Sequence, residues 1–265
     1  FDKPLVYYSL SNLILSNIFD ICVVTQKKNI KPLKILFNDL IKFGLKISYK
    51  VQNKPNGIPE CLKLCKNFLG KSDLVLALGD NIFFGHNFED CLHEGIENLN
   101  NGFSSIFIHP VKNPENFGVV DFKKGKIQNI KEKPKKPKSN NAITGLYFLT
   151  NNSINRSKKL KRSKRGETEI IDLLDIYLKE NKLKYINTGR GTYWTDAGTP
   201  ESLNDASNFI KSIQDSQGLL VSSLEEILLY KKKISRKDLL KLISKKKSFY
   251  YKNLINIIKN ENSRI

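Results

Sequence analysis

Two aspartates in this sequence each stand where a predicted strand or similar element ends and a glycine turn follows. Asp80 comes after the continuous apolar run 74–78, and Asp196 ends a second element and precedes Gly198. In open α/β sheets, ligands bind outside the carboxyl ends of the strands. Mg²⁺ takes one or two protein carboxylates and fills its other positions with water and phosphate oxygens. The two positions therefore suit a magnesium ion.

Both aspartates also have a structural interpretation. An aspartate after a strand often closes a turn or caps a helix, and this is the alternative for Asp80. In the second segment the capping role falls to Thr199, because Pro200 suits the first helical position and Glu201 places an acid in the first turn. Asp196 is then left without an obvious structural task.

A third charged site follows another predicted strand. Glu132 and Lys133 stand just before a proline- and lysine-rich loop. A carboxylate there could accept hydrogen bonds from sugar hydroxyls, while the neighbouring ammonium could meet a phosphate. A solvated charge pair is the alternative.

Strands that alternate with helices are expected to position these residues. The first helix follows Asp2-Lys3-Pro4, with Asp2 as its expected cap. Apolar patterning predicts strands at 19–25, 46–51 and 74–78 and helices at 30–42 and 58–68. This order is typical of a doubly wound α/β sheet, and an unbroken apolar run indicates a parallel strand covered on both faces.

The second half of the chain begins with short strands. We expect them at 103–109, 117–122, 126–131, 143–149 and 183–188. Helices are expected at 168–180, after Thr199 and, in short lysine-rich pieces, beyond residue 219. The chain is thus predicted to form an α/β domain over 1–218 and a helical appendage over 219–265.

The charge balance is strongly basic. The 265 residues include 45 basic and 26 acidic residues, for a formal net charge of +19. Such an excess attracts anionic ligands, from nucleotides and sugar phosphates to nucleic acid. A sequence crowded with lysine, asparagine and isoleucine, as A/T-rich codons produce, explains the charge without any function. Because no aromatic and basic motif supports a nucleic-acid binder, we expect no nucleic-acid partner.

Cysteine and methionine usage bears on the compartment. The four cysteines are too few for a disulfide framework. Cys61 and Cys65 could share a helix face, but no histidine or second cysteine pair completes a metal site. Free thiols in a cytoplasmic protein are expected. Polar residues interrupt the most apolar stretch, 5–24, so we expect no membrane span. Methionine is absent, so we expect the native chain to begin before Phe1.

Seven segments carry a resemblance that covers essentially the whole chain. They are Leu78-Gly79-Asp80-Asn81-Ile82-Phe83-Phe84-Gly85, Phe117-Gly118-Val119-Val120, Glu132-Lys133-Pro134-Lys135-Lys136-Pro137-Lys138-Ser139, Ile143-Thr144-Gly145-Leu146-Tyr147-Phe148, Arg165-Gly166-Glu167, Gly189-Arg190-Gly191 and Trp194-Thr195-Asp196-Ala197-Gly198-Thr199. In this order they resemble the glucose-1-phosphate thymidylyltransferases, a family of sugar nucleotidyltransferases. The resemblance continues through Leu224-Glu225-Glu226-Ile227.

The resemblance implies a Rossmann-like nucleotidyltransferase fold with a mostly parallel central sheet and helices on both faces. It also implies a Mg²⁺ cofactor, a homotetramer and a cytoplasmic role in making dTDP-glucose for dTDP-rhamnose and other deoxysugars of surface polysaccharides. Asp80 and Asp196 would be catalytic and hold the metal, and Gln52 and Gly57 match the base-reading segment. The glucose-phosphate pocket would be lined by Asn81, Gly118, Glu132, Lys133 and Ile143.

The reaction implied is in-line attack of a glucose 1-phosphate oxygen on the α-phosphorus of dTTP, with release of pyrophosphate. A sugar-1-phosphate uridylyltransferase that prefers UTP is an alternative, because Glu60 replaces an amide residue in the family's base-reading segment. A truncated, non-catalytic homologue also stays open. The family opens with a strand and a glycine-rich phosphate loop that have no counterpart here, so we expect residues 1–265 alone to fold but not to catalyse.

Overall fold

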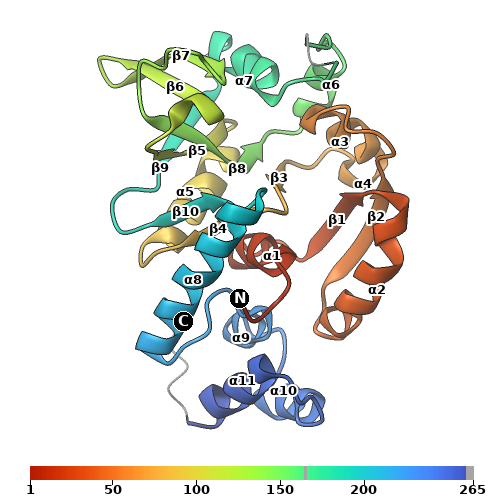
Figure 1. The fold of residues 1–265 in the computed structure, drawn as a ribbon. Coiled ribbons are helices and arrows are strands. Elements are labelled where there is room, and N and C mark those ends of the chain that lie inside the picture. The colour runs from red at the N-terminus through yellow and green to blue at the C-terminus, as the bar shows by residue number, and fades with distance from the viewer. Residues whose placement is uncertain (164–165, 261–265) are drawn as a thin grey trace.

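The computed structural model describes residues 1–163 and 166–260. The helices are α1 (Val6–Leu15), α2 (Lys27–Lys42), α3 (Ile58–Leu64), α4 (Lys66–Leu69), α5 (Phe88–Asn100), α6 (Ser153–Ser157), α7 (Ile170–Lys179), α8 (Pro200–Gln217), α9 (Leu224–Tyr230), α10 (Arg236–Ile243), α11 (Phe249–Lys259) and the short η1 (Pro114–Asn116). The strands are β1 (Asp20–Thr25), β2 (Lys46–Val51), β3 (Leu74–Ala77), β4 (Asn81–Phe84), β5 (Ser104–Pro110), β6 (Gly118–Lys123), β7 (Lys126–Glu132), β8 (Asn141–Leu149), β9 (Leu183–Asn187) and β10 (Tyr193–Asp196). In Figure 1 strands β5, β6, β7 and β8 lie at the upper left, β1 and β2 lie on the right, and helices α9, α10 and α11 lie at the bottom.

The largest sheet has the strand order β7-β6-β8-β5-β9, and β3 also pairs with β8. The predicted α/β class is confirmed, but the sheet is mixed rather than mostly parallel. Among the strands that the structure describes, only β1–β2 and β5–β9 are parallel pairs. The reason lies in β8, a largely buried strand that runs against β3, β5 and β6. Apolar runs can reveal that β8 is buried, but they do not reveal its direction.

β1 and β2 form a separate parallel pair on one side of the molecule, next to α2 (Figure 1). Within the described residues, β1 pairs only with β2 and β3 only with β8, so each leaves one edge unpaired. A cavity of about 410 Å³ is lined by residues of both strands and by α3 and α4. We call this space the β1–β3 cavity. It separates the β1–β2 pair from the main sheet.

Local sequence explains the ends of two helices. The Thr199 hydroxyl accepts a hydrogen bond from the Ser202 backbone amide, so the predicted cap of α8 is confirmed. The expected cap of α1 is wrong, because α1 begins at Val6 with no side-chain cap. The Asp2 carboxylate instead accepts hydrogen bonds from Lys3 at 2.6 Å and from Gln214 at 2.9 Å, which join the start of the chain to α8.

Three elements differ from the expectations. The helix expected at 58–68 is divided at Cys65 into α3 and α4. β4 was not expected, because its four residues directly follow the Gly79–Asp80 turn. α5 was not expected either, although its buried residues recur every three or four positions, a periodicity that indicates a helix.

The C-terminal helices α9, α10 and α11 pack against α1 and α2 in one hydrophobic cluster (Figure 1). Leu224, Leu239 and Leu254 bring one fully buried side chain each from the three helices. The predicted division after residue 218 coincides with Gly218, whose φ of 67° ends α8, and the division itself stays a prediction. No described helix has the length and apolarity needed to span a bilayer.

Candidate active site

The turn before β4 and the end of β10 bring two carboxylates to one place. β10 pairs with β4 so that Asp196 lies opposite Asn81, and the Ala197 amide donates a hydrogen bond to the Asp80 carbonyl oxygen at 2.8 Å. A β-carbon built on Gly198 would lie 2.9 Å from Asp196 Oδ1 and 3.6 Å from Asp80 Oδ2. Both predicted metal ligands therefore surround the same point, and we call them the acidic edge.

The acidic edge is electrostatically unfavourable by itself. Burial, and after it the charge of Asp80, raises the pKa of Asp196. The Gly198 amide, which donates to Asp196 Oδ1 at 2.9 Å, and the Lys133 ammonium act in the opposite direction. Within the described residues neither carboxylate has a salt-bridge partner, although lysine and arginine outnumber the acids by 45 to 26. Two carboxylates held together in this way indicate a site for a cation.

Asn81 fixes the orientation of Asp80 from inside the protein. Its Nδ2 donates to Asp80 Oδ1 at 3.0 Å, and its Oδ1 accepts from the Gly145 amide and from Trp194 Nε1, each at 2.8 Å. A β-carbon on Gly145 would lie 2.5 Å from Asn81 Nδ2, so this close approach requires glycine. The Asn81 side chain is 3 % exposed, and its predicted role toward a sugar phosphate stays a prediction.

Three of the residues predicted to bind the sugar phosphate converge on one side of β6. Gly118 lies opposite Glu132 in the β6–β7 pair. A β-carbon on Gly118 would lie 3.4 Å from Glu132 Oε2 and 3.6 Å from Ile143 Cδ1. It would also lie 2.8 Å from Ile171 Cδ1, so a larger residue at position 118 would collide with α7. The predicted glucose-phosphate pocket is therefore a compact group of side chains around a glycine.

Lys133 connects this pocket to the acidic edge. It follows β7 with a φ of 41°, and its amide donates to the Phe117 carbonyl at 2.9 Å. Its ammonium is close enough to lower the pKa of Asp196 against the larger effect of burial. A phosphate that contacts Lys133 would therefore also lie near the carboxylates.

Tyr147 is a buried residue near the predicted site that the sequence did not single out. Burial, and then the charges of Glu132, Asp196 and Asp80, raise the pKa of its hydroxyl above the usual range. Three carboxylates of the predicted site thus act on the Tyr147 hydroxyl from within the same part of the molecule. Ile143 and Gly145 stand four and two positions before it on β8, and this alternation places all three on one face of the strand. Extending the predicted pocket along that face would have found Tyr147.

The predicted base-reading residues contact each other. Gln52 Nε2 donates to the Gly57 carbonyl at 3.4 Å, and Cys61 Sγ donates to Gln52 Oε1 at 3.4 Å. Gly57 has a φ of 98°, and a β-carbon on it would lie only 2.0 Å from the Thr168 carbonyl oxygen. The backbone at Gly57 therefore packs directly against Thr168, which lies just before α7. Arg165, part of a predicted motif in that neighbourhood, lies outside the described residues.

The β1–β3 cavity connects these regions. Its lining includes Ile58, next to Gly57, and Gly79, next to Asp80. Residues adjacent in sequence to Gly57 and to Asp80 therefore border the same space.

The donor set of the acidic edge fits Mg²⁺. Its ligands are two hard carboxylates, and the described residues hold no group of three or more His, Cys, Asp or Glu arranged around a metal. A structural zinc site would need four such ligands. Mg²⁺ needs only one or two carboxylates when water and substrate phosphates complete its shell.

An α/β fold that holds two close carboxylates beside a strand end is compatible with enzymes that transfer phosphoryl-linked groups. A family model described as nucleotidyl transferase matches residues 1–213. The chain therefore belongs to the nucleotidyl transferase family.

Its relatives have a narrower description. A glucose-1-phosphate thymidylyltransferase of Neisseria meningitidis serogroup A is 42% identical over 228 residues, which cover 86% of this chain and 78% of the relative. One from Mycolicibacterium smegmatis has the same identity and coverage. A Bacillus anthracis crystal structure described as a glucose-1-phosphate thymidylyltransferase in complex with a sucrose matches at a TM-score of 0.70 and 35% identity, covering 78% of this chain and 82% of that one. The predicted resemblance is confirmed.

Proposed function

We propose that this chain transfers a thymidylyl group from dTTP to glucose 1-phosphate, giving dTDP-glucose and pyrophosphate, with Mg²⁺ as cofactor. The relatives at 42% identity that are named for this activity support the choice of substrates. The observation that carries the proposal is the acidic edge, where Asp80 and Asp196 surround one point and, among the described residues, neither forms a salt bridge.

The chemistry requires positioning more than a covalent nucleophile. A phosphate oxygen of glucose 1-phosphate would form a bond to the α-phosphorus of dTTP while the bond from that phosphorus to the pyrophosphate breaks. Asp80 and Asp196 would hold Mg²⁺, which offsets negative charge on the reacting phosphates. Asn81 and the Gly198 amide already orient the two carboxylates, so little rearrangement is needed when substrates bind.

The sugar phosphate would bind between Gly118, Glu132 and Lys133. The Glu132 carboxylate would accept hydrogen bonds from glucose hydroxyls, and the Lys133 ammonium would contact the phosphate. Since Gly118 has no side chain, Ile171 and Glu132 can pack closely against the backbone of β6, which holds the Glu132 carboxylate in place. The position of Lys133 near Asp196 would direct the phosphate toward the metal-bound nucleotide.

The nucleotide base would meet the Gln52 side chain and the Gly57 backbone. Contacts with Gly57 and Cys61 hold the Gln52 amide in one orientation before any ligand binds. A fixed amide, which can both donate and accept, suits the donor and acceptor edge of a pyrimidine.

We further propose that the enzyme acts in the cytoplasm as a homotetramer and supplies activated glucose for deoxysugars of surface polysaccharides. Sizing by light scattering tests the tetramer directly. A monomer at micromolar concentration would contradict it.

The substrate proposal is tested by pyrophosphate release from a panel of dTTP, UTP, CTP and GTP, each with glucose 1-phosphate, galactose 1-phosphate or mannose 1-phosphate. We expect dTTP with glucose 1-phosphate to give the highest kcat/KM of all the pairs. A preference for UTP would contradict the proposal that dTTP is the nucleotide substrate. Absence of turnover with every pair would contradict the proposed transferase activity.

A further inference from the structure

We infer that Cys22 and Cys65 form a dithiol site that peroxide oxidises to a disulfide. The two sulfurs lie 3.5 Å apart, although the residues are 43 positions apart in sequence. Cys22 lies on β1, and Cys65 ends α3. The pair therefore joins the outlying β1–β2 unit to the helices beside the main sheet.

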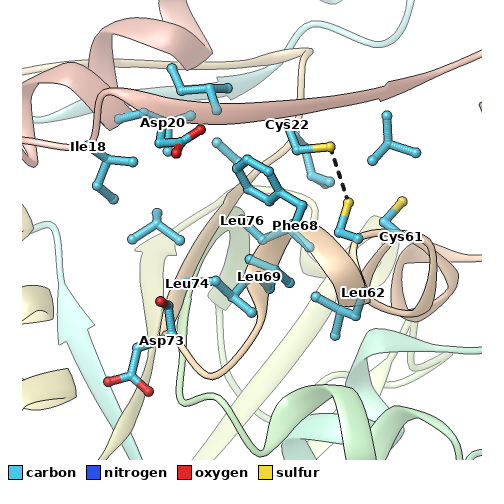
Figure 2. A pocket seen from close by; sticks show the side chains of 18 of the residues that line it. Ile18, Asp20, Cys22, Cys61, Leu62, Phe68, Leu69, Asp73, Leu74 and Leu76 are labelled. Carbon is cyan, nitrogen blue, oxygen red and sulfur yellow. Dashed lines mark hydrogen bonds between the residues drawn. The ribbon is translucent and has the colours of Figure 1, made fainter. Parts of the chain in front are cut away.

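The geometry allows a bond to form with little movement. An S–S bond is about 2.05 Å long, so the sulfurs must approach by roughly 1.5 Å. Figure 2 shows the Cys22 sulfur directed at its partner along the dashed line, with the β1–β3 cavity beside them.

The two thiols are chemically unequal. The hydrogen bond from Cys65, opposed by burial and aided by Ser48 and Lys50, lowers the pKa of Cys22 to about 6. The same contact, together with burial, raises the pKa of Cys65. Cys22 is therefore the nucleophile, since the thiolate is the reactive form of cysteine. Cys65 is the thiol that resolves the first product.

The reaction balances with one molecule of hydrogen peroxide. The Cys22 thiolate attacks a peroxide oxygen, the O–O bond breaks, and hydroxide leaves to take the proton that Cys22 had released. Cys65 then attacks the oxidised sulfur, the S–S bond forms, and the S–O bond breaks with loss of water. Two thiols lose two electrons in total, and peroxide is reduced to two molecules of water.

Cys61 provides a matched control within the same cavity lining. It stands one helical turn before Cys65, yet its sulfur contacts Gln52 Oε1 at 3.4 Å rather than another sulfur. Burial raises its pKa to about 11. Cys61 should therefore stay reduced under conditions that oxidise Cys22.

The bond would tie β1 to the end of α3 and enclose β2, Gln52 and Gly57 in one covalent loop. Closing a loop of this length restricts the unfolded chain, so oxidation should raise Tm by roughly 5–10 °C, reversibly with dithiothreitol. Disulfides in reducing compartments are typically transient and serve redox sensing. The site would make this part of the fold responsive to peroxide.

The test is mass spectrometry of the native protein after treatment with hydrogen peroxide, with free thiols blocked before digestion. We expect a Cys22–Cys65 linked peptide, with Cys61 and Cys91 blocked as free thiols. Cys61→Ser should leave the linked peptide unchanged. Cys65→Ser should stop the reaction at a Cys22 sulfenic acid that dimedone traps.

Two results would overturn the inference. One is oxidation of Cys61 or Cys91 with no Cys22–Cys65 peptide. The other is loss of that peptide in Cys61→Ser while its circular dichroism spectrum stays native. Both readouts are independent of enzyme activity, so failure of the proposed reaction would not affect this test.

Discussion

Two aspartates in different parts of the molecule have opposite environments. Asp39, on α2, accepts hydrogen bonds from Lys246 at 2.5 Å and from Lys42 at 3.2 Å. These lysines, Lys246 first, lower the pKa of Asp39, and the contacts join α2 to the C-terminal helices. Asp196 instead faces Asp80, and burial followed by that negative charge raises its pKa.

The difference separates a carboxylate that joins two parts of the fold through lysines from one that forms no salt bridge among the described residues and that we propose holds a metal ion. With lysine and arginine so abundant in the sequence, a cationic partner for Asp196 would be easy to supply. The fold instead places a second acid beside it and uses backbone and amide hydrogen bonds to keep both in position. Such unfavourable pairs are concentrated at functional sites.

The largest expected effect is on catalysis. Asp80→Asn or Asp196→Asn should lower kcat by about 10²–10³ or more, because each removes charge that would hold the metal at the reacting phosphates. Pyrophosphate release at limiting Mg²⁺ measures the loss. Asp39→Asn is the matched control and should keep near-normal turnover. Near-normal activity of both acidic-edge variants would contradict the claim that these carboxylates, unlike Asp39, hold the metal.

A second effect concerns two glycines that differ as the aspartates do, one at the site and one away from it. Gly44→Ala meets no atom within 4 Å and suffers only from its φ of 89°, about 1 kcal/mol of unfolding free energy. Gly57→Ala adds a collision with the Thr168 carbonyl and should cost about 3 kcal/mol or more. Urea denaturation measures both. Equal losses would show that the Gly57–Thr168 contact is not as tight as described.

Glu132→Ala should weaken sugar-phosphate binding more than nucleotide binding. Leaving glucose hydroxyls unpaired would cost about 1–3 kcal/mol, so KM for glucose 1-phosphate should rise roughly 5- to 150-fold. The KM for dTTP should change much less. Glu94→Ala, an exposed acid on α5, is the control. Equal changes in both KM values would contradict the assignment of Glu132 to the sugar pocket.

The smallest effect is on stability. An acid whose folded pKa is raised binds more protons when folded, so stability falls as pH rises from the unfolded value of about 3.8 through the folded pKa. In metal-free protein, Asp196→Asn should therefore raise Tm at pH 7, and the gain should vanish as pH falls below about 4. Asp39→Asn should lower Tm at pH 7, because its folded pKa is depressed. A change in Tm of the same sign for both variants at pH 7 would contradict the proposed difference between Asp39 and Asp196.

Most of the site could be predicted from local sequence, because Asp80 and Asp196 each lie in a recognisable turn. Their closeness was predicted from the resemblance, but the pairing of β10 with the unexpected strand β4, which brings them together, could not be predicted from local sequence. Tyr147 was missed for a related reason: its neighbours Glu132, Asp80 and Asp196 come from three separate segments. Apolar patterning found nearly every strand of the fold, but strand direction and the separation of β1 from β3 depend on long-range pairing.

Manganese binding tests the central claim most directly, because Mn²⁺ accepts the same oxygen ligands as Mg²⁺ and is visible by electron paramagnetic resonance. Protein-bound Mn²⁺ would be titrated in the native enzyme with dTDP-glucose present, in Asp80→Asn, Asp196→Asn and the double variant, with Asp39→Asn as control. If the two carboxylates share one ion, each single variant should lose the site, and the double variant should bind no more weakly than either. Retention of a full-affinity site in both single variants would show that Asp80 and Asp196 do not hold a common metal.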